Sequence, residues 1–286
     1  MNISTGILFG MAAMLGWGTS NFIAAKAVRE TGVVKVVLWS QIVSLCLYLF
    51  LFPFFSKTFA FSSNTLTVLV AASLLMVIAY LAFCKGLQVG AVSVVSAVSS
   101  SAVAVTVLLS IVFLKQALTI LQAIGVSLAI IGAVLTSFKA HDLLNIRLEK
   151  IAVGAKYGLI AMLGWGLAFV LIDILVSRMG WFLPVVFMKI FGVAFIFIYF
   201  IFTKTNLSFP ENSAMLVIAI GLVEVIAFLS YNIGISSEYT SVIAPIAFAY
   251  PAITIILARI FFKEILETSQ KAGVISVLAG LILLTL

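Results

Sequence analysis

The six residues AMLGWG occupy positions 13–18, and the same six residues occupy positions 161–166, which are 148 positions further along the chain. One ungapped offset of 148 extends this match in both directions. It aligns Gly6, Gly10, Lys115, Gln122, Gly125 and Gly132 with Gly154, Gly158, Lys263, Gln270, Gly273 and Gly280. The offset predicts that the chain arose by duplication of one unit.

Composition places both units in a lipid bilayer. Hydrophobic residues make up 64% of the chain and charged residues 9%, whereas a soluble domain has roughly 25% charged residues. A membrane-spanning helix needs about 20 mostly apolar residues. The apolar runs do not alternate as the strands of a membrane β-barrel do. We therefore expect ten transmembrane helices, at 4–25, 34–55, 65–85, 91–113, 118–138, 152–175, 182–203, 213–234, 240–260 and 267–285.

Five helices per unit have a geometric consequence. After an odd number of crossings, the second unit enters the membrane from the opposite side. We therefore expect two inverted five-helix repeats, 1–138 and 152–286, joined by a polar hinge at 139–151. Such repeats recur in secondary transporters, with the binding site near the middle of the bilayer between them. The expected fold is an all-α integral membrane protein that works by alternating access.

Lysine and arginine are distributed unequally over the two sides of this predicted bundle. Most of them fall on the side of the hinge, and only Lys57, Lys115 and Arg178 fall on the other side. Cytoplasmic loops carry an excess of lysine and arginine. The pattern predicts a plasma (inner) membrane protein with a cytoplasmic hinge and both termini outside the cytoplasm.

Several other classes of function lack their signatures. The net charge of +7 comes from basic residues at helix ends, which is typical of membrane proteins rather than of nucleic-acid binding. His141 stands alone in the hinge, and Cys46 and Cys84 have no metal-ligand spacing, so we expect no metal and no cofactor. Clustered nucleophiles and bases are missing, and so is a nucleotide-binding loop. We therefore expect neither an intramembrane enzyme nor an ATP-driven pump.

Two stretches of sequence carry a family resemblance. Residues 14–28, MLGWGTSNFIAAKAV, resemble the first-helix signature of EamA-type members of the drug/metabolite transporter superfamily. Residues 245–283 resemble the end of that family's repeat, with a proline in the fourth helix, an acidic residue after it, and a glutamine and a glycine opening the fifth, namely Pro251, Glu264, Gln270 and Gly273. The first half departs from the pattern, because Val103 replaces the proline and Gln116 replaces the acidic residue.

The resemblance implies a secondary transporter for small metabolites, in relatives often amino acids or similar polar compounds, and frequently an exporter. It also implies a central cavity lined by the first four helices of each half, with the fifth and tenth helices at the periphery. Some relatives have both termini in the cytoplasm, which is opposite to the orientation that the charge pattern predicts here.

Two charged residues lie well inside predicted spans and are candidates for substrate binding. Lys189 falls in the seventh span and Glu224 in the middle of the eighth, and their partners at the 148 offset are Gln41 and Met76. A charge near the bilayer centre costs roughly 2.5–3.5 kcal/mol on insertion scales and usually has a function. The two could form a structural ion pair, Lys189 could extend to the interface, or both could bind the ends of a zwitterion. Glu224 is also a candidate for proton coupling.

Helical spacing suggests further candidates for substrate binding. Glu224 shares a helix face with two aromatic residues at i+4 and i+7, and the first span places a tryptophan beside hydrogen-bonding groups. These candidates and others from matched or aromatic positions are Trp17, Ser20, Asn21, Tyr80, Trp165, Phe228, Tyr231 and Tyr250. Small or matched residues among them could instead serve helix packing.

Asp173, near the end of the sixth span, is expected to pair with Arg178 at the surface. Pro245 and Pro251 remove backbone donors and should kink the ninth span. Their partners at the 148 offset, Ala97 and Val103, lack this effect, so we expect unequal bending in the two halves.

The sequence therefore predicts a carrier that moves a small polar or zwitterionic metabolite, amino-acid-like and in the export direction, with protons as one candidate coupling ion. A carrier of the same fold for lipids or hydrophobic compounds is the alternative. Because both halves lie in one chain, a monomer and a homodimer are both compatible with the sequence.

Overall fold

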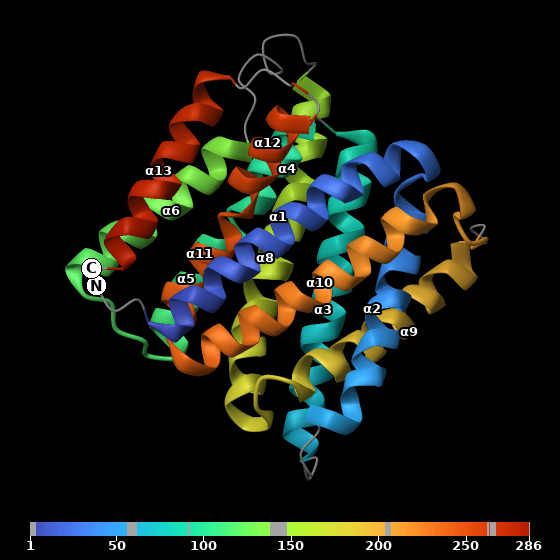
Figure 1. Cartoon of the computed structure of the whole chain (residues 1–286), viewed down its shortest axis with the longest axis horizontal. Coiled ribbons are helices and arrows are strands. Elements are labelled where there is room, and N and C mark those ends of the chain that lie inside the picture. The colour runs from blue at the N-terminus through green and yellow to red at the C-terminus, as the bar shows by residue number, and fades with distance from the viewer. Residues whose placement is uncertain are drawn as a thin grey trace.

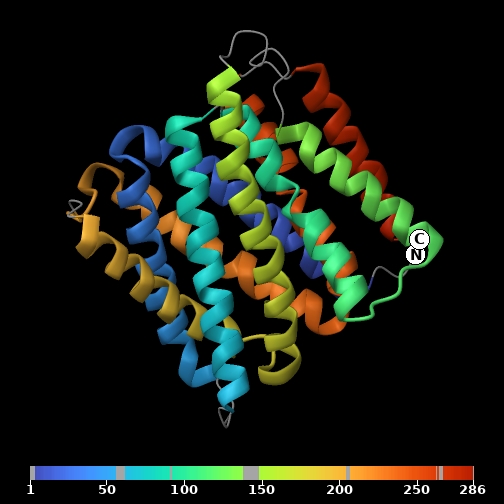
Figure 2. The same ribbon diagram turned by 180° about the vertical axis from the view of Figure 1, so that it is seen from behind.

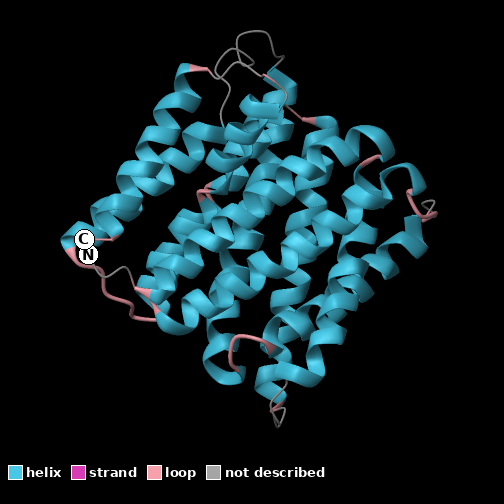
Figure 3. Cartoon of the chain, in the orientation of Figure 1, coloured by secondary structure: helices cyan, strands magenta, loops and turns pink. Residues whose placement is uncertain are grey.

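The architecture is entirely helical in the residues that the computed structural model describes, which are 4–55, 62–90, 92–137, 148–203, 207–261, 263 and 267–285 (Figure 3). Eight segments are long and apolar enough to cross a membrane, and two shorter apolar helices, Leu183–Tyr199 and Thr268–Leu284, fall in the seventh and tenth predicted stretches. The chain is thus a multi-pass membrane protein. The count of ten crossings stays a prediction, and most of the predicted hinge, 139–147, lies outside the described residues.

The helices are labelled in chain order in Figure 1. They are α1 (Thr5–Thr31), α2 (Val33–Phe55), α3 (Ser63–Val89), α4 (Val92–Ser100), α5 (Ala102–Phe113), α6 (Ile120–Ser137), α8 (Leu148–Met179), α9 (Leu183–Thr203), the 3₁₀ turn η1 (Glu211–Ser213), α10 (Ala214–Ser237), α11 (Thr240–Phe248), α12 (Tyr250–Phe261) and α13 (Thr268–Leu284).

The fourth and ninth predicted spans are each broken into two helices at matched positions. Ser101 separates α4 from α5, and Ala249 separates α11 from α12, which is the same offset of 148. At both breaks the ladder shifts to i→i+3 bonds: Ser101 N donates to Val98 O at 3.2 Å, and Ala249 N donates to Ile246 O at 3.2 Å. The first-half span, for which the proline pattern predicted no kink, is therefore broken as well, and unequal bending of the two halves stays a prediction.

Different residues produce the two breaks. In the second half, Pro251 stands in the first turn of α12, where a missing N–H costs little, and Pro245 stays inside α11. The first half has no proline at the matched positions, and serines near the break have a comparable effect. Ser100 and Ser101 donate their hydroxyls to Ala97 O, both at 3.1 Å, and such bonds compete with the helical ladder. The break in the first half could therefore have been predicted from its serines, but not from the positions of the prolines.

The two halves pack against each other through reciprocal antiparallel helix pairs. Helix α1 lies along α10, and its counterpart α8 lies along α3 (Figures 1 and 2). Gly16 on α1 faces Ala227 on α10, and Gly164 on α8 faces Ala79 on α3 in the matching position. A Cβ atom on either glycine would lie within 2.8 Å of its neighbour. Small residues are required there because they let membrane helices approach closely.

Hydrogen bonds repeat with the same offset. Thr254 Oγ1 donates to Gly18 O at 3.0 Å, and Thr106 Oγ1 donates to Gly166 O at 3.3 Å. Each bond ties the broken span of one half to the first helix of the other. Because sequence matches and cross-helix contacts share one offset, the halves are related by a pseudo-two-fold axis.

The position of this axis follows from residues that contact their own counterparts. Ser276 Oγ on α13 donates to Leu128 O on α6 at 2.8 Å. Lys189 Nζ on α9 donates to Gln41 Oε1 on α2. In both cases the partners are 148 residues apart, so the pseudo-two-fold axis passes through both contacts. It runs from the α6–α13 pair at one side of the bundle to the α2–α9 pair at the other.

Candidate functional site

A cavity of about 230 Å³ lies between the two halves. It is bordered by α1, α2 and α3 of the first half and by α8, α9 and α10 of the second, with two residues beside the α11–α12 break. The axis contact between Gln41 and Lys189 forms part of its wall. The lining residues are Trp17, Asn21, Val37, Gln41, Tyr48, Ser73, Met76, Val77, Tyr80, Phe83, Trp165, Phe169, Ile172, Val185, Met188, Lys189, Gly192, Ile196, Glu224, Phe228, Phe248 and Tyr250.

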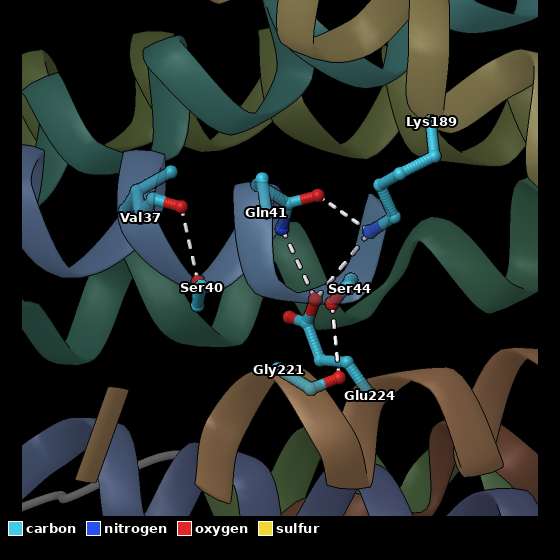
Figure 4. A network of polar contacts seen from close by, with 7 residues as sticks. All are labelled: Val37, Ser40, Gln41, Ser44, Lys189, Gly221 and Glu224. Atoms are coloured by element: carbon cyan, nitrogen blue, oxygen red, sulfur yellow. Dashed lines mark hydrogen bonds and ion pairs between the residues drawn. The ribbon is translucent and has the colours of Figure 1, made fainter. Parts of the chain in front are cut away.

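A triad of polar side chains from three helices meets at this wall (Figure 4). Lys189 Nζ lies 3.5 Å from Glu224 Oε2. Gln41 bridges the pair: its Nε2 donates to Glu224 Oε2 at 3.1 Å, and its Oε1 accepts from Lys189 Nζ. This bridge fixes the orientation of the Gln41 amide, because one end faces an anion and the other a cation. Lys189 therefore points across the bundle to its partners rather than to the interface.

The backbone around Glu224 is held by close packing of α2 on α10. Ser44 Oγ donates to Gly221 O at 2.9 Å (Figure 4). A Cβ atom at Gly221 would lie only 2.7 Å from Val43 Cγ1, so glycine permits this approach. Gly221 lies one turn before Glu224, and Ser44 lies one turn after Gln41. The close crossing thus sets the distance at which the triad forms.

The ion pair is in contact with the cavity and is not sealed into the core. The side chains of Lys189 and Glu224 keep 11% and 20% of their surface accessible. Lys189 Nζ also lies 5.3 Å from the centre of the Phe228 ring, within the range of a cation–π contact. One positive and one negative group are therefore presented side by side to whatever occupies the cavity.

Trp17 is the centre of an aromatic wall. Its ring centroid lies 5.1 Å from that of Phe228, 5.8 Å from Phe169 and 6.0 Å from Phe248, all edge to face. Edge-to-face packing is the favourable geometry for such rings. The counterpart of Trp17, Trp165, contacts the ring of Phe83, with the ring centroids 5.3 Å apart. The rings that pack edge to face on Trp17 thus all come from the second half.

Of the ten residues predicted to bind substrate, eight line the cavity. These are Trp17, Asn21, Tyr80, Trp165, Lys189, Glu224, Phe228 and Tyr250. Ser20 is buried and lies outside the lining. Tyr231 is completely buried one layer behind the wall, with its ring 5.5 Å from Trp17 and 5.1 Å from Phe169. The helical stripe from Glu224 to Tyr231 therefore leaves the cavity after Phe228.

Several lining residues were not among the predicted binding residues. Gln41 was noted only as the partner of Lys189 at the 148 offset, yet it is the hydrogen-bonding bridge of the triad. The repeat contained the signal, because duplicated residues meet where the pseudo-two-fold axis passes between them. Tyr48, Phe169 and Met188 gave no such signal, because uniformly apolar helices do not show which face points inward.

Asp173 is placed differently from its predicted position. Gln116 Nε2 donates to Asp173 Oδ2 at 2.8 Å, and Gln116 Oε1 accepts from Ser241 N at 2.9 Å. Within the described part of the chain, Asp173 forms no ion pair with Arg178. The expected surface pairing is therefore wrong. Gln116, which stands where the family pattern has an acidic residue, instead fixes this carboxylate between α8 and the start of α11.

Two apolar half-bundles that enclose a cavity lined by an ion pair are the arrangement expected of a membrane transporter. Sequence comparison agrees: the model of the EamA-like transporter family matches residues 4–138 and again residues 152–286. The chain belongs to this family, as its first-helix and closing signatures indicated.

The chain is similar in sequence to a curated protein and similar in fold to a solved structure. An uncharacterised protein of Methanocaldococcus jannaschii is 33% identical over 135 residues, which is 47% of this chain and 98% of that protein. That relative therefore has the length of one repeat. A solved crystal structure matches with a TM-score of 0.79 at 15% identity, over 99% of this chain and 98% of the other. This second similarity shows the fold alone.

Proposed function

We propose that this protein is a secondary active transporter for a small zwitterionic metabolite that carries an apolar side chain, as amino acids do. The observation that carries the proposal is the Lys189–Glu224 pair, which faces the cavity from two different helices. A zwitterion would place its carboxylate on Lys189 and its ammonium on Glu224. One ion pair within the protein would then become an alternating set of four charges with the substrate.

Electrostatics favours a zwitterion over a singly charged solute. Lys189 and Glu224 together are neutral, so a net charge brought into the cavity would lie unbalanced in a medium of low dielectric. A substrate with both charges satisfies both groups. The aromatic wall around Trp17 would then hold the apolar side chain. Gln41, which bonds both partners, would keep its position when they separate to admit the substrate.

The cavity also favours a metabolite over a lipid, which was the alternative function. Its volume of about 230 Å³ suits one small molecule, and a membrane lipid has two long acyl chains. Lipid transport is therefore the competing function that the transport experiment must distinguish.

Alternating access is the mechanism that the internal symmetry supports. We propose ten crossings arranged as two inverted five-helix repeats, 1–138 and 152–286, with residues 139–151 as the hinge. Two halves with nearly equivalent contacts can exchange conformations, and each exchange would open the cavity to the other side. The relative of single-repeat length supports the duplication. No nucleotide-binding motif accompanies this unit, so an ion gradient or exchange would supply the energy.

The lysine and arginine bias supports a plasma membrane orientation with the hinge in the cytoplasm and both termini outside, and we propose export as the direction of transport. The orientation can be tested in cells by placing a cysteine at residue 2 or at residue 143 and labelling it with a membrane-impermeant reagent. Labelling of residue 2 alone supports the orientation, and labelling of residue 143 alone reverses it.

Counterflow in proteoliposomes tests the transport function. Candidate amino acids are first selected by thermal stabilisation of the purified protein, because a ligand that binds only the folded state raises apparent stability. Liposomes that contain the protein are then loaded with each selected amino acid. Saturable counterflow of a zwitterion supports the proposal. Movement of a labelled phospholipid without counterflow of any zwitterion would establish the lipid carrier instead, and flux that does not saturate would indicate a channel.

A further inference from the structure

A second carboxylate lies in the bundle behind the aromatic wall of the cavity. Asp173 on α8 is six residues before the last residue of that helix, Met179, which is about 9 Å along a helix of 1.5 Å rise per residue. Its match at the 148 offset is Ala25, so only the second half has this group. No described lysine or arginine forms an ion pair with Asp173. A carboxylate in a transmembrane helix without a basic partner usually has a function.

Two buried hydroxyls next to Asp173 lack hydrogen-bond partners among the residues that the structure describes. Thr240 lies beside both the Asp173 carboxylate and the Tyr231 hydroxyl, and both Thr240 and Tyr231 are completely buried. Neither Thr240 Oγ1 nor Tyr231 OH completes a hydrogen bond of good geometry. Unpaired hydroxyls are costly in the interior. Thr240 also directly precedes Ser241, whose N–H donates to the Gln116 amide that bonds Asp173. Because neither hydroxyl has an existing partner to lose, the cluster can accept a hydrogen bond from a protonated Asp173 or donate one to its ionised form.

The donors in the cluster select a proton rather than a metal ion. A metal ion such as Ca²⁺ or Mg²⁺ needs several oxygen ligands. Gln116 instead turns its N–H group to Asp173 Oδ2, because its own oxygen is occupied by Ser241 N. An N–H group at this position would repel a metal ion. It can, however, keep its hydrogen bond to Oδ2 whether the second oxygen, Oδ1, is protonated or not. The described residues also contain no group of three or more acidic, histidine or cysteine ligands.

We infer that Asp173 takes up and releases the coupling proton of transport at Oδ1, and that Thr240 and Tyr231 pass its state to the cavity wall. This inference rests on the transport function proposed above. The structure leaves both hydroxyls without a bond of good geometry. In the proposed ionised state, Thr240 O–H would turn to donate to Asp173, and Tyr231 O–H would turn to donate to Thr240. When water delivers a proton to Oδ1, the new O–H donates to Thr240, Thr240 donates to Tyr231, and the Tyr231 hydrogen must turn away.

The direction of this hydrogen-bond chain therefore depends on the charge of Asp173. Its last member, Tyr231, packs against Trp17 and Phe169, with ring centroids 5.5 and 5.1 Å away, and both of these residues line the cavity. A change at Asp173 would thus reach the aromatic wall through packed side chains. Glu224, in contrast, is already engaged by Lys189 and Gln41 in the cavity wall.

Other charged or titratable groups on the surrounding elements are few. On α8 itself Arg178 lies further along the helix, Lys115 precedes Gln116 and is exposed, and Lys189 on α9 pairs with Glu224 on α10. The remaining groups near the start of α11 are Glu238 and Tyr239, of which Tyr239 is exposed, and Tyr231 itself. None of these offers Asp173 a fixed counter-charge in the described structure.

Infrared difference spectroscopy of the purified protein tests the proton site without any substrate. Spectra at low and high pH should show a protonated-carboxyl band that disappears in Asp173→Asn and persists in the matched variant Glu224→Gln. Tyr231→Phe and Thr240→Val should keep the band but shift the pH at which it appears. A band that is unchanged in Asp173→Asn, or that is lost only in Glu224→Gln, would overturn the inference even if transport is demonstrated.

Proteoliposomes then test the coupling. With one proton exchanged per substrate, a gradient of one pH unit sustains up to about tenfold accumulation. Asp173→Asn should reduce this accumulation to about onefold while counterflow without a gradient continues. Accumulation that survives in Asp173→Asn refutes the inference, and accumulation that follows a sodium gradient instead replaces the proton with sodium. Absence of counterflow in the wild type would refute the transport function separately from the infrared result.

Discussion

Neutralising one member of the axial ion pair should impair recognition of one end of the substrate only. We consider Glu224→Gln, which removes the negative charge but keeps an amide oxygen that can accept from Lys189. The fold should tolerate this change, because Gln41 continues to bond Lys189. The substrate ammonium, in contrast, would lose its charged acceptor.

The magnitude follows from the loss of one hydrogen bond to a charged group. Such a bond contributes roughly 1.5–3 kcal/mol, and 1.4 kcal/mol corresponds to about tenfold in the dissociation constant. Glu224→Gln should therefore weaken binding of a zwitterionic amino acid by about 10- to 150-fold. The value lies toward the lower end, because Glu224 keeps 20% of its side chain accessible and water can replace part of the interaction.

Calorimetry with substrate analogues makes the prediction specific. The deaminated analogue keeps only the carboxylate, so its weaker affinity should be the same in wild type and Glu224→Gln. The matched variant Lys189→Gln, which recreates the residue of the first repeat, should show the opposite pattern and spare the decarboxylated amine. The reasoning is refuted if Glu224→Gln binds the zwitterion as tightly as wild type, or if both analogues lose affinity equally in both variants.

Three further outcomes are expected from the packing. Gly132→Ala should lower stability in detergent by about 1–3 kcal/mol, because its Cβ would lie 2.7 Å from Gly273 O; the matched control Gly192→Ala, which meets nothing within 4 Å, should be neutral or stabilising in the same thermal scan. Trp17→Ala should cost about 3–5 kcal/mol of stability and abolish ligand-induced stabilisation, whereas retained stabilisation would exclude the aromatic wall from binding. Asn232→Leu should lower the free energy of unfolding by about 1–3 kcal/mol, because it removes the hydrogen bond from Asn232 Nδ2 to Trp181 O, 2.9 Å long, in the α8–α9 turn. An unchanged melting temperature would show that this hydrogen bond is dispensable.

The candidate site was partly predictable because charge inside a membrane span is conspicuous. Lys189 and Glu224 stood out against apolar neighbours, and both line the cavity. The prediction for Tyr231 relied on an ideal helical stripe. In the structure that stripe passes behind Trp17, so Tyr231 packs against the aromatic wall on the side that faces away from the cavity. Spacing along one helix cannot show where a neighbouring helix interrupts its view of the cavity.

The placement of Asp173 illustrates a different limit. Arg178 is near in sequence, and Gln116 is 57 residues away. Only the packing of the α5 end against α8 and α11 brings the Gln116 amide to the carboxylate. Sequence proximity favoured the wrong partner because helix packing, rather than chain distance, determines which polar groups meet.

The amino-acid sequence by itself determined that the chain is helical, that it lies in a membrane, and that two matched halves share one offset. It did so because hydrophobicity and internal repetition are properties of the order of residues alone. Which faces of these helices enclose the cavity was decided only in the tertiary structure. Lipid and protein interior are both apolar, so the pattern of side chains does not separate them. The meeting of Gln41 with Lys189 across the pseudo-two-fold axis exists only once the halves have packed.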